Sequence, residues 1–98
     1  FNKIKLQEGM IISNEPGYYE TNNFGIRIEN LIYTKKNQNK LKFENLTLAP
    51  IEKKLINFKH LNFKEKKYLN EYHKKVYNTL SPFLNKNEKN WLESLVNQ

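Results

Sequence analysis

The spacing of the apolar residues changes near residue 60, and this change constrains the fold of the 98-residue chain more than any other feature. Before the change, apolar and polar residues alternate, as where Arg27 separates Ile26 from Ile28. A period of two is typical of β-strands. After the change, the spacing becomes that of one face of a helix. The apolar residues with this helical spacing are Tyr68, Leu69, Tyr72, Val76 and Leu80.

These two periods predict an α+β fold, in which antiparallel strands form a meander and a helical tail follows. We predict a β part at residues 1–60 and a helical extension at residues 61–98, with Pro50–His60 as the junction. The expected strands are MIIS (Met10–Ser13), GIRIENLIYT (Gly25–Thr34) and LKFENLTLAPI (Leu41–Ile51).

The tail contains signals for two helices. Asn62 with Glu65 three positions later forms a capping box at the start of the first helix. Ser81-Pro82 separates the two, because proline restricts the residue before it and suits a first helical turn. We expect Asn87 to cap the second helix. Its apolar residues are Trp91, Leu92, Leu95 and Val96.

Two apolar faces on separate helices are hard to bury on one surface of a parent domain. An exposed aromatic and aliphatic patch of that size usually marks an interface, and Trp and Tyr are enriched at interface hot spots. We therefore expect the 61–98 tail to mediate a homodimer. The alternative is that both faces pack within one molecule.

Composition excludes several classes of function. The chain has no cysteine, hence no disulfide framework and no thiolate metal site, and it has no apolar run of about 20 residues that would span a membrane. Its net charge of +7 could indicate nucleic-acid binding. However, Arg27 is the only arginine among 17 basic residues, and arginine is the preferred residue for phosphate and base contacts. We therefore predict neither a nucleic-acid partner nor a membrane partner.

Two glutamates in the stretch SNEPGYYETNNFGIRIEN (Ser13–Asn30) are equally distant from Asn22. Thr21-Asn22-Asn23 has the composition of a turn, so Glu15 and Glu29 would lie opposite or nearly opposite each other on antiparallel strands. Directly opposed residues have Cβ atoms roughly 4.5–5.5 Å apart. The repulsion of such a pair can be resolved by protonation of one carboxyl, by a cation such as Arg27, or by a divalent metal between them. Simple exposure of both carboxylates to solvent is the fourth explanation.

The motif NEPGYYETNNFGIRIEN, with LQEGMIIS before it and LKFENLTLAPI after it, closely resembles the C-terminal part of the catalytic domain of aminopeptidase P. These Xaa-Pro aminopeptidases belong to the pita-bread metallopeptidases, and the similarity is greatest to the cytosolic eukaryotic form. The resemblance extends through the tail, where the YH pair of that form matches Tyr72-His73. It implies that this chain is the last segment of an enzyme that removes the N-terminal residue from peptides with proline second.

The resemblance also implies roles for individual residues. In this family two Asp, one His and two Glu hold two divalent metal ions, and the two Glu match Glu15 and Glu29. Manganese is the expected metal, because carboxylates with one imidazole suit Mn²⁺ better than structural Zn²⁺. Glu15 would also pass a proton to the leaving nitrogen, unless it is a ligand only. Arg27 would fix a missing acidic ligand or lie free on the surface. Tyr18 and Tyr19 lie near the site and would contact substrate or simply pack, with Tyr18 as the predicted substrate contact.

The other three ligands cannot come from this chain, which has no Asp and whose two histidines, His60 and His73, follow the glutamates. We expect both histidines to be packed or solvated. Because the chain begins at Phe1 and not at Met, we expect it to be a piece of a longer protein, with the rest of the catalytic domain upstream. The alternatives are a prolidase, another pita-bread peptidase such as a methionine aminopeptidase, or a catalytically inactive binding domain. The expected compartment is the cytoplasm, with a degradative vacuole as the alternative.

Overall fold

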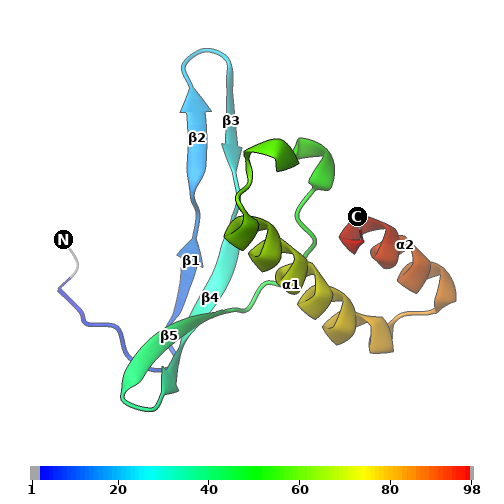
Figure 1. Ribbon diagram of the computed structural model, residues 1–98. Helices are drawn as coiled ribbons and strands as arrows, with labels where there is room; N and C mark the ends of the chain where they lie inside the picture. The colour runs from blue at the N-terminus through cyan, green and yellow to red at the C-terminus, as the bar shows by residue number, and fades with distance from the viewer. Residues whose placement is uncertain (1–2, 98) are drawn as a thin grey trace. The chain divides into compact units, whose positions relative to one another are not determined.

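The computed structural model describes residues 3–97 and shows strands followed by helices, which confirms the predicted α+β class (Figure 1). The chain divides between Thr47 and Leu48 into two compact units, and each is described by itself. The two units meet before the predicted junction at Pro50–His60. The division into a β part at 1–60 and a helical extension at 61–98 stays a prediction. The described helices are not long and apolar enough to cross a membrane.

The first unit contains five strands in two antiparallel sheets. One sheet has the order β1-β4-β5, and the other is the β2–β3 hairpin. The strands are β1 (Ile11–Asn14), β2 (Gly17–Glu20), β3 (Phe24–Arg27), β4 (Asn30–Asn37) and β5 (Lys40–Asn45). In Figure 1 the β2–β3 hairpin continues the β1–β4 pair in the same direction. The two sheets are therefore successive parts of one long ribbon.

One register runs through both parts of this ribbon. Asn14 pairs with Asn30 in the first part, and Gly17 pairs with Arg27 in the second. Between them, the Ile28 N–H donates to the Pro16 carbonyl over 3.1 Å, in the same register. The ladder is interrupted here because Pro16 has no N–H to donate in return.

The first unit buries little apolar surface. Thr34 is its only fully buried residue within the described part, and it accepts the Met10 N–H over 3.0 Å through its hydroxyl. The large apolar side chains of both sheet faces are exposed, namely Ile11, Tyr18, Tyr19, Phe24, Ile26, Ile28, Leu31, Leu41, Phe43 and Leu46. A sheet normally covers at least one apolar face, so these faces lack the layer that a complete domain would place on them.

The second unit has its own core. It contains η1 (Lys53–Leu55), η2 (Phe58–His60), α1 (Phe63–Leu80), η3 (Ser81–Phe83) and α2 (Lys86–Val96). The core joins the apolar faces of both helices, with Tyr72 and Val76 from α1 and Leu92 and Val96 from α2. The two faces that were expected to compete for one surface therefore bury each other, because η3 lets the chain reverse between the helices. Most of the two apolar faces therefore packs within the helical unit, Trp91 is 64% exposed, and the dimer stays a prediction.

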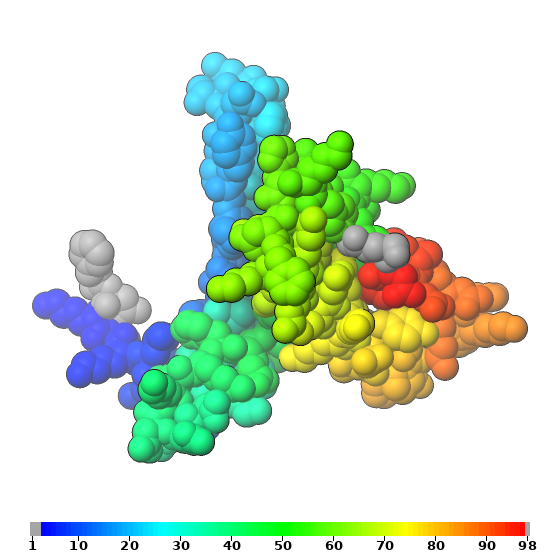
Figure 2. All heavy atoms as spheres, viewed as in Figure 1, coloured from blue at the N-terminus to red at the C-terminus, as the bar shows by residue number. Residues whose placement is uncertain are grey.

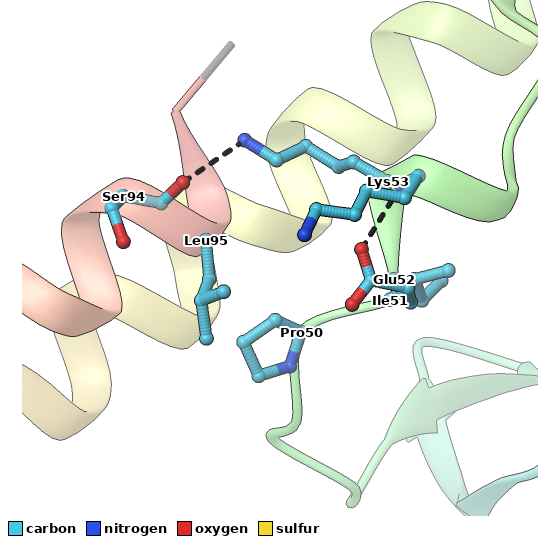
Figure 3. A pocket seen from close by; sticks show the side chains of 7 residues that line it. Pro50, Ile51, Glu52, Lys53, Ser94 and Leu95 are labelled. Carbon is cyan, nitrogen blue, oxygen red and sulfur yellow. Dashed lines mark hydrogen bonds between the residues drawn. The ribbon is translucent and has the colours of Figure 1, made fainter.

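Capping decides where the helices begin. Asn62 and Glu65 form the predicted capping box at the start of α1. The predicted cap of α2 is wrong: Asn85 caps it instead of Asn87, because the Glu88 side chain lies three residues after Asn85 and accepts its N–H over 2.9 Å. At the other end of α2 the Lys53 ammonium donates to the Ser94 carbonyl (Figure 3). It also donates to the Asn97 carbonyl. A cation there satisfies carbonyls that a helix end leaves without partners.

Candidate metal and substrate face

Glu15 and Glu29 lie directly opposite each other, as the spacing about Asn22 predicts. Glu15 follows the last residue of β1 and Glu29 precedes the first residue of β4, so both occupy the interruption of the ribbon and neither lies within a strand. The hydrogen-bonded pair of Pro16 with Ile28 makes the neighbouring pair of Glu15 with Glu29 a non-hydrogen-bonded one. In such pairs the Cα atoms approach to about 4.5 Å and the side chains are close.

The turn that sets this pairing has the predicted location. The hairpin loop is Thr21-Asn22-Asn23, and Asn22 takes a positive φ of 58°. Asparagine tolerates this left-handed conformation better than most residues. The Asn23 side chain also donates to the Glu20 carboxylate over 2.7 Å, which fixes the loop from within.

Arg27 lies between the two carboxylates. Its guanidinium is 4.0 Å from an oxygen of Glu15 and 4.0 Å from an oxygen of Glu29. Of the explanations for the paired charges, neutralisation by Arg27 and exposure to solvent are therefore both seen in the described residues. All three side chains are partly exposed, and ion pairs in such surroundings contribute about 0–1 kcal/mol. So weak an association leaves the carboxylates available to other ligands.

Of the two tyrosines expected near the site, Tyr19 lies on the same face as these charges. Residues 15, 17 and 19 alternate with 16 and 18, so Tyr19 shares the face of Glu15. Its ring lies over two glycines, Gly25 directly opposite it across the hairpin and Gly17 two residues earlier on its own strand. A Cβ added to Gly25 would be 2.7 Å from the Tyr19 Cδ1, and one added to Gly17 would be 2.7 Å from the Tyr19 hydroxyl oxygen. The ring therefore points along the ribbon toward Arg27, the residue paired with Gly17.

Tyr18, the predicted substrate contact, is not brought to this face. It lies on the opposite face of the hairpin, where its ring packs beside Phe24 with centroids 6.0 Å apart. Simple alternation from Glu15 points to Tyr19 instead, and Gly17 and Gly25 leave the space in which its ring fits. A substrate contact by Tyr18 stays a prediction without support from this geometry.

We name the side chains of Glu15, Tyr19, Arg27 and Glu29 the acidic face. Its donors fit a metal site in kind, since paired carboxylates are the oxygen ligands that hard divalent ions such as Mn²⁺ prefer. They are too few to form a complete metal site, because residues 3–97 contain no cluster of three or more His, Cys, Asp or Glu side chains that could hold a metal ion. The acidic face can thus supply part of a metal site and requires ligands from elsewhere to complete it.

The two histidines are not part of the acidic face. His60 is exposed in η2, and His73 is buried in α1, as the packed or solvated interpretation predicts. All four residues of the acidic face are exposed, and the β2–β3 hairpin that carries Tyr19 and Arg27 is drawn in light blue in Figure 2.

Two family models together match nearly the whole described chain. Residues 1–36 match metallopeptidase family M24, and residues 39–97 match the C-terminal region of peptidase M24. Their division near residue 38 falls in the turn between β4 and β5.

Curated relatives and one solved structure agree with these matches. The chain is 43% identical to Xaa-Pro aminopeptidase 1 of Dictyostelium discoideum and to a probable Xaa-Pro aminopeptidase P of Coprinopsis cinerea, in each case over 97% of this chain. It spans only 17% and 16% of those relatives, respectively. It also resembles the crystal structure of X-prolyl aminopeptidase from Caenorhabditis elegans, described as a cytosolic enzyme with a di-nuclear active site. The TM-score is 0.81 and the identity 34%, over 93% of this chain and 16% of that one. These similarities confirm the expected C-terminal part of a pita-bread domain.

A double-mutant cycle tests the placement of Tyr19. We expect Gly25→Ala to destabilise the full-length protein by about 1–3 kcal/mol, because its Cβ would overlap the Tyr19 ring. In a Tyr19→Ala background the same substitution should cost almost nothing. Chemical denaturation of the four proteins measures this coupling. If Gly25→Ala costs the same in both backgrounds, the ring does not lie on Gly25.

Proposed function

The chain belongs to metallopeptidase family M24, and from that membership we propose that it is the C-terminal segment of the catalytic domain of an Xaa-Pro aminopeptidase. The observation that carries this proposal is the opposition of Glu15 and Glu29 on one face, with Arg27 between them. The substrates are peptides with proline second, as the names of the relatives and of the structural neighbour indicate. The proposed compartment is the cytosol, the description given to the C. elegans enzyme.

The rest of the catalytic domain is the first partner that this proposal requires. It would supply two Asp and one His, the three family ligands that do not come from this chain. The same domain would cover the exposed apolar faces of the first unit, where Ile26, Ile28 and Phe43 are each about half exposed.

Glu15 and Glu29 would hold two divalent ions, with manganese as the proposed metal. When bound, two such ions lower the pKa of a water and offset the negative charge that develops on the substrate carbonyl oxygen. Arg27 would then turn from its weak ion pairs toward an acidic ligand of the missing part and hold it in place. Tyr19, next to Arg27 on the acidic face, is placed to keep the guanidinium from turning away.

Glu15 has a second proposed task. The bond before proline is a tertiary amide without an N–H, and its nitrogen must gain a proton to leave. A carboxylate beside the reacting water can accept a proton from that water and return it to this nitrogen. Of the two opposed glutamates, the resemblance assigns this relay to Glu15.

A homodimer is the last part of the proposal. Leu92 and Val96 fill the core, so its support in the structure is the exposed aromatic side chains of the tail, among which Trp91 has 64% of its surface exposed. A large exposed tryptophan is a typical interface anchor.

Replacement of either glutamate should remove metal. In the full-length protein we expect Glu15→Gln and Glu29→Gln each to lower bound manganese below two ions per chain and to reduce kcat by about a hundredfold or more, as the loss of a metal ligand does. Glu20→Gln is the matched control, because Glu20 lies on the same hairpin and bonds only within the turn. Elemental analysis and peptide hydrolysis provide the measurements. If both variants still bound two manganese ions per chain, the ligand assignment would be refuted. If the wild type bound metal but hydrolysed no peptide, the protein would be a binding domain.

Arg27→Lys should not be a conservative change. Lysine keeps the positive charge but loses the planar fork that can hold a carboxylate through two hydrogen bonds. We expect a loss in kcat of about tenfold or more, with little change in melting temperature because the present ion pairs are weak. Steady-state kinetics and thermal denaturation separate the two effects, and unchanged kcat would show that Arg27 has no role beyond the surface.

Trp91→Ala should weaken the dimer without unfolding the tail, since the exposed ring contributes little to the core. We expect the dissociation constant to rise about tenfold or more, as for a typical hot-spot residue. Phe83→Ala is the control, because Phe83 is 85% exposed and belongs to η3. Sedimentation velocity over a range of concentrations measures both variants, and equal association of Trp91→Ala and wild type would place any interface elsewhere.

A further inference from the structure

Two neighbouring residues of α1 hold the segment that precedes η1. The Tyr72 hydroxyl donates to the Ala49 carbonyl over 2.7 Å, and the Ile51 N–H donates to Nε2 of His73 over 3.0 Å. Both side chains are buried, with only 4% and 1% of their surfaces exposed. Ile51, together with Leu48, also packs on the core formed by both helices. The segment from Leu48 to Ile51 is thus fixed to α1 by two side-chain bonds and by apolar contacts.

The bond from Ile51 requires a neutral imidazole. Nε2 can accept an N–H only when it carries no proton, so the single ring proton of His73 is on Nδ1. Within residues 3–97, Nδ1 is buried and has no hydrogen-bond partner. Protonation at Nε2 would set a second donor against the Ile51 N–H and would leave a charge in a buried position, and each of these changes costs free energy.

The charges around His73 do not offset this cost. On α1, the residues one turn away are Leu69, Asn70, Val76 and Tyr77, all uncharged. From the segment that packs against it, the Lys53 ammonium repels a proton, and the Glu52 carboxylate is engaged with the Lys54 N–H over 3.0 Å. The pKa of His73 is lowered, first by burial and then by Lys53.

We propose that His73 is a proton-operated latch that holds the 48–51 segment on α1 when neutral and releases it when protonated. The segment follows the last strand of the first unit directly in the chain, so its release would free the connection between the sheet unit and the helical unit. The latch depends on one proton, because the Ile51 N–H can bond to Nε2 only while Nε2 is unprotonated and because the other ring nitrogen, Nδ1, is buried.

The direction of the effect follows from the lowered pKa. The unfolded chain binds the proton more readily than the folded one, so the stabilisation by neutral His73 is complete above the ordinary histidine pKa of about 6.5. It is lost as the pH falls from there toward the lowered folded pKa. Over that interval the opening equilibrium of the segment should rise by up to about tenfold per pH unit, the limit for one proton.

Hydrogen–deuterium exchange of the full-length protein tests the latch. Peptides covering residues 48–52 are followed by mass spectrometry between pH 8 and 5, after correction for the intrinsic exchange rate. His73→Gln keeps an acceptor for Ile51 but cannot titrate, and His60→Gln removes the exposed histidine of η2 as the matched control. As the pH is lowered, we expect residues 48–52 to lose protection from exchange in the wild type and in His60→Gln. In His73→Gln their protection should stay constant. An equal loss in His73→Gln would overturn the proposal.

A second measurement does not depend on a variant that folds. Slow exchange of the imidazole C2 hydrogen reports the pKa of each histidine in the wild type. A His73 pKa below the ordinary histidine value of about 6.5, with the protection of segment 48–52 lost between these two pH values, supports the latch. A His73 that is charged while the segment stays protected would refute it.

Discussion

One continuous backbone register, centred on the turn at Asn22, determines which side chains share a face of the first unit. The register passes through the interruption at Pro16 without a shift, because the Ile28 N–H still reaches the Pro16 carbonyl. A slip by one residue would move every side chain of one strand to the other face. Glu15 would then no longer meet Glu29, and Arg27 would no longer lie between them. The acidic face thus depends on the left-handed conformation that Asn22 adopts.

Local chemistry made this part of the site predictable. The turn residues, the equal spacing about Asn22 and the alternation at Arg27 are all properties of neighbouring residues, and they give the opposition of Glu15 with Glu29 directly. The choice between Tyr18 and Tyr19 required confidence that the alternation survives Pro16-Gly17, which sequence alone does not provide. The position of Gly25 opposite Tyr19 and beneath its ring is a cross-strand property, visible only when the register is known.

Longer-range packing explains where the structure differs from the sequence predictions in the rest of the chain. The alternation of LKFENLTLAPI predicts one strand to Ile51, but β5 ends at Asn45. Beyond that point Ala49 and Ile51 bond to Tyr72 and His73, more than 20 residues away, and these bonds replace a strand ladder. The mutual burial of the two helices is equally non-local, since it depends on how η3 directs α2. The cap of α2 could have been predicted from neighbouring residues, because Glu88 lies three residues after Asn85 and so favours Asn85 over Asn87 as the cap.

The two units obtain their order from different sources. The helical unit has a core of its own, in which Val76 is completely buried, so its geometry follows from its own side chains. The ribbon buries almost no apolar side chain and is held mainly by backbone hydrogen bonds, which alone leave a two-stranded hairpin marginally stable in water. Metal ligands must be held within fractions of an ångström to select an ion. Under the proposed assignment of Glu15 and Glu29 as metal ligands, a layer covering the ribbon would both hold these carboxylates in place and carry the remaining ligands.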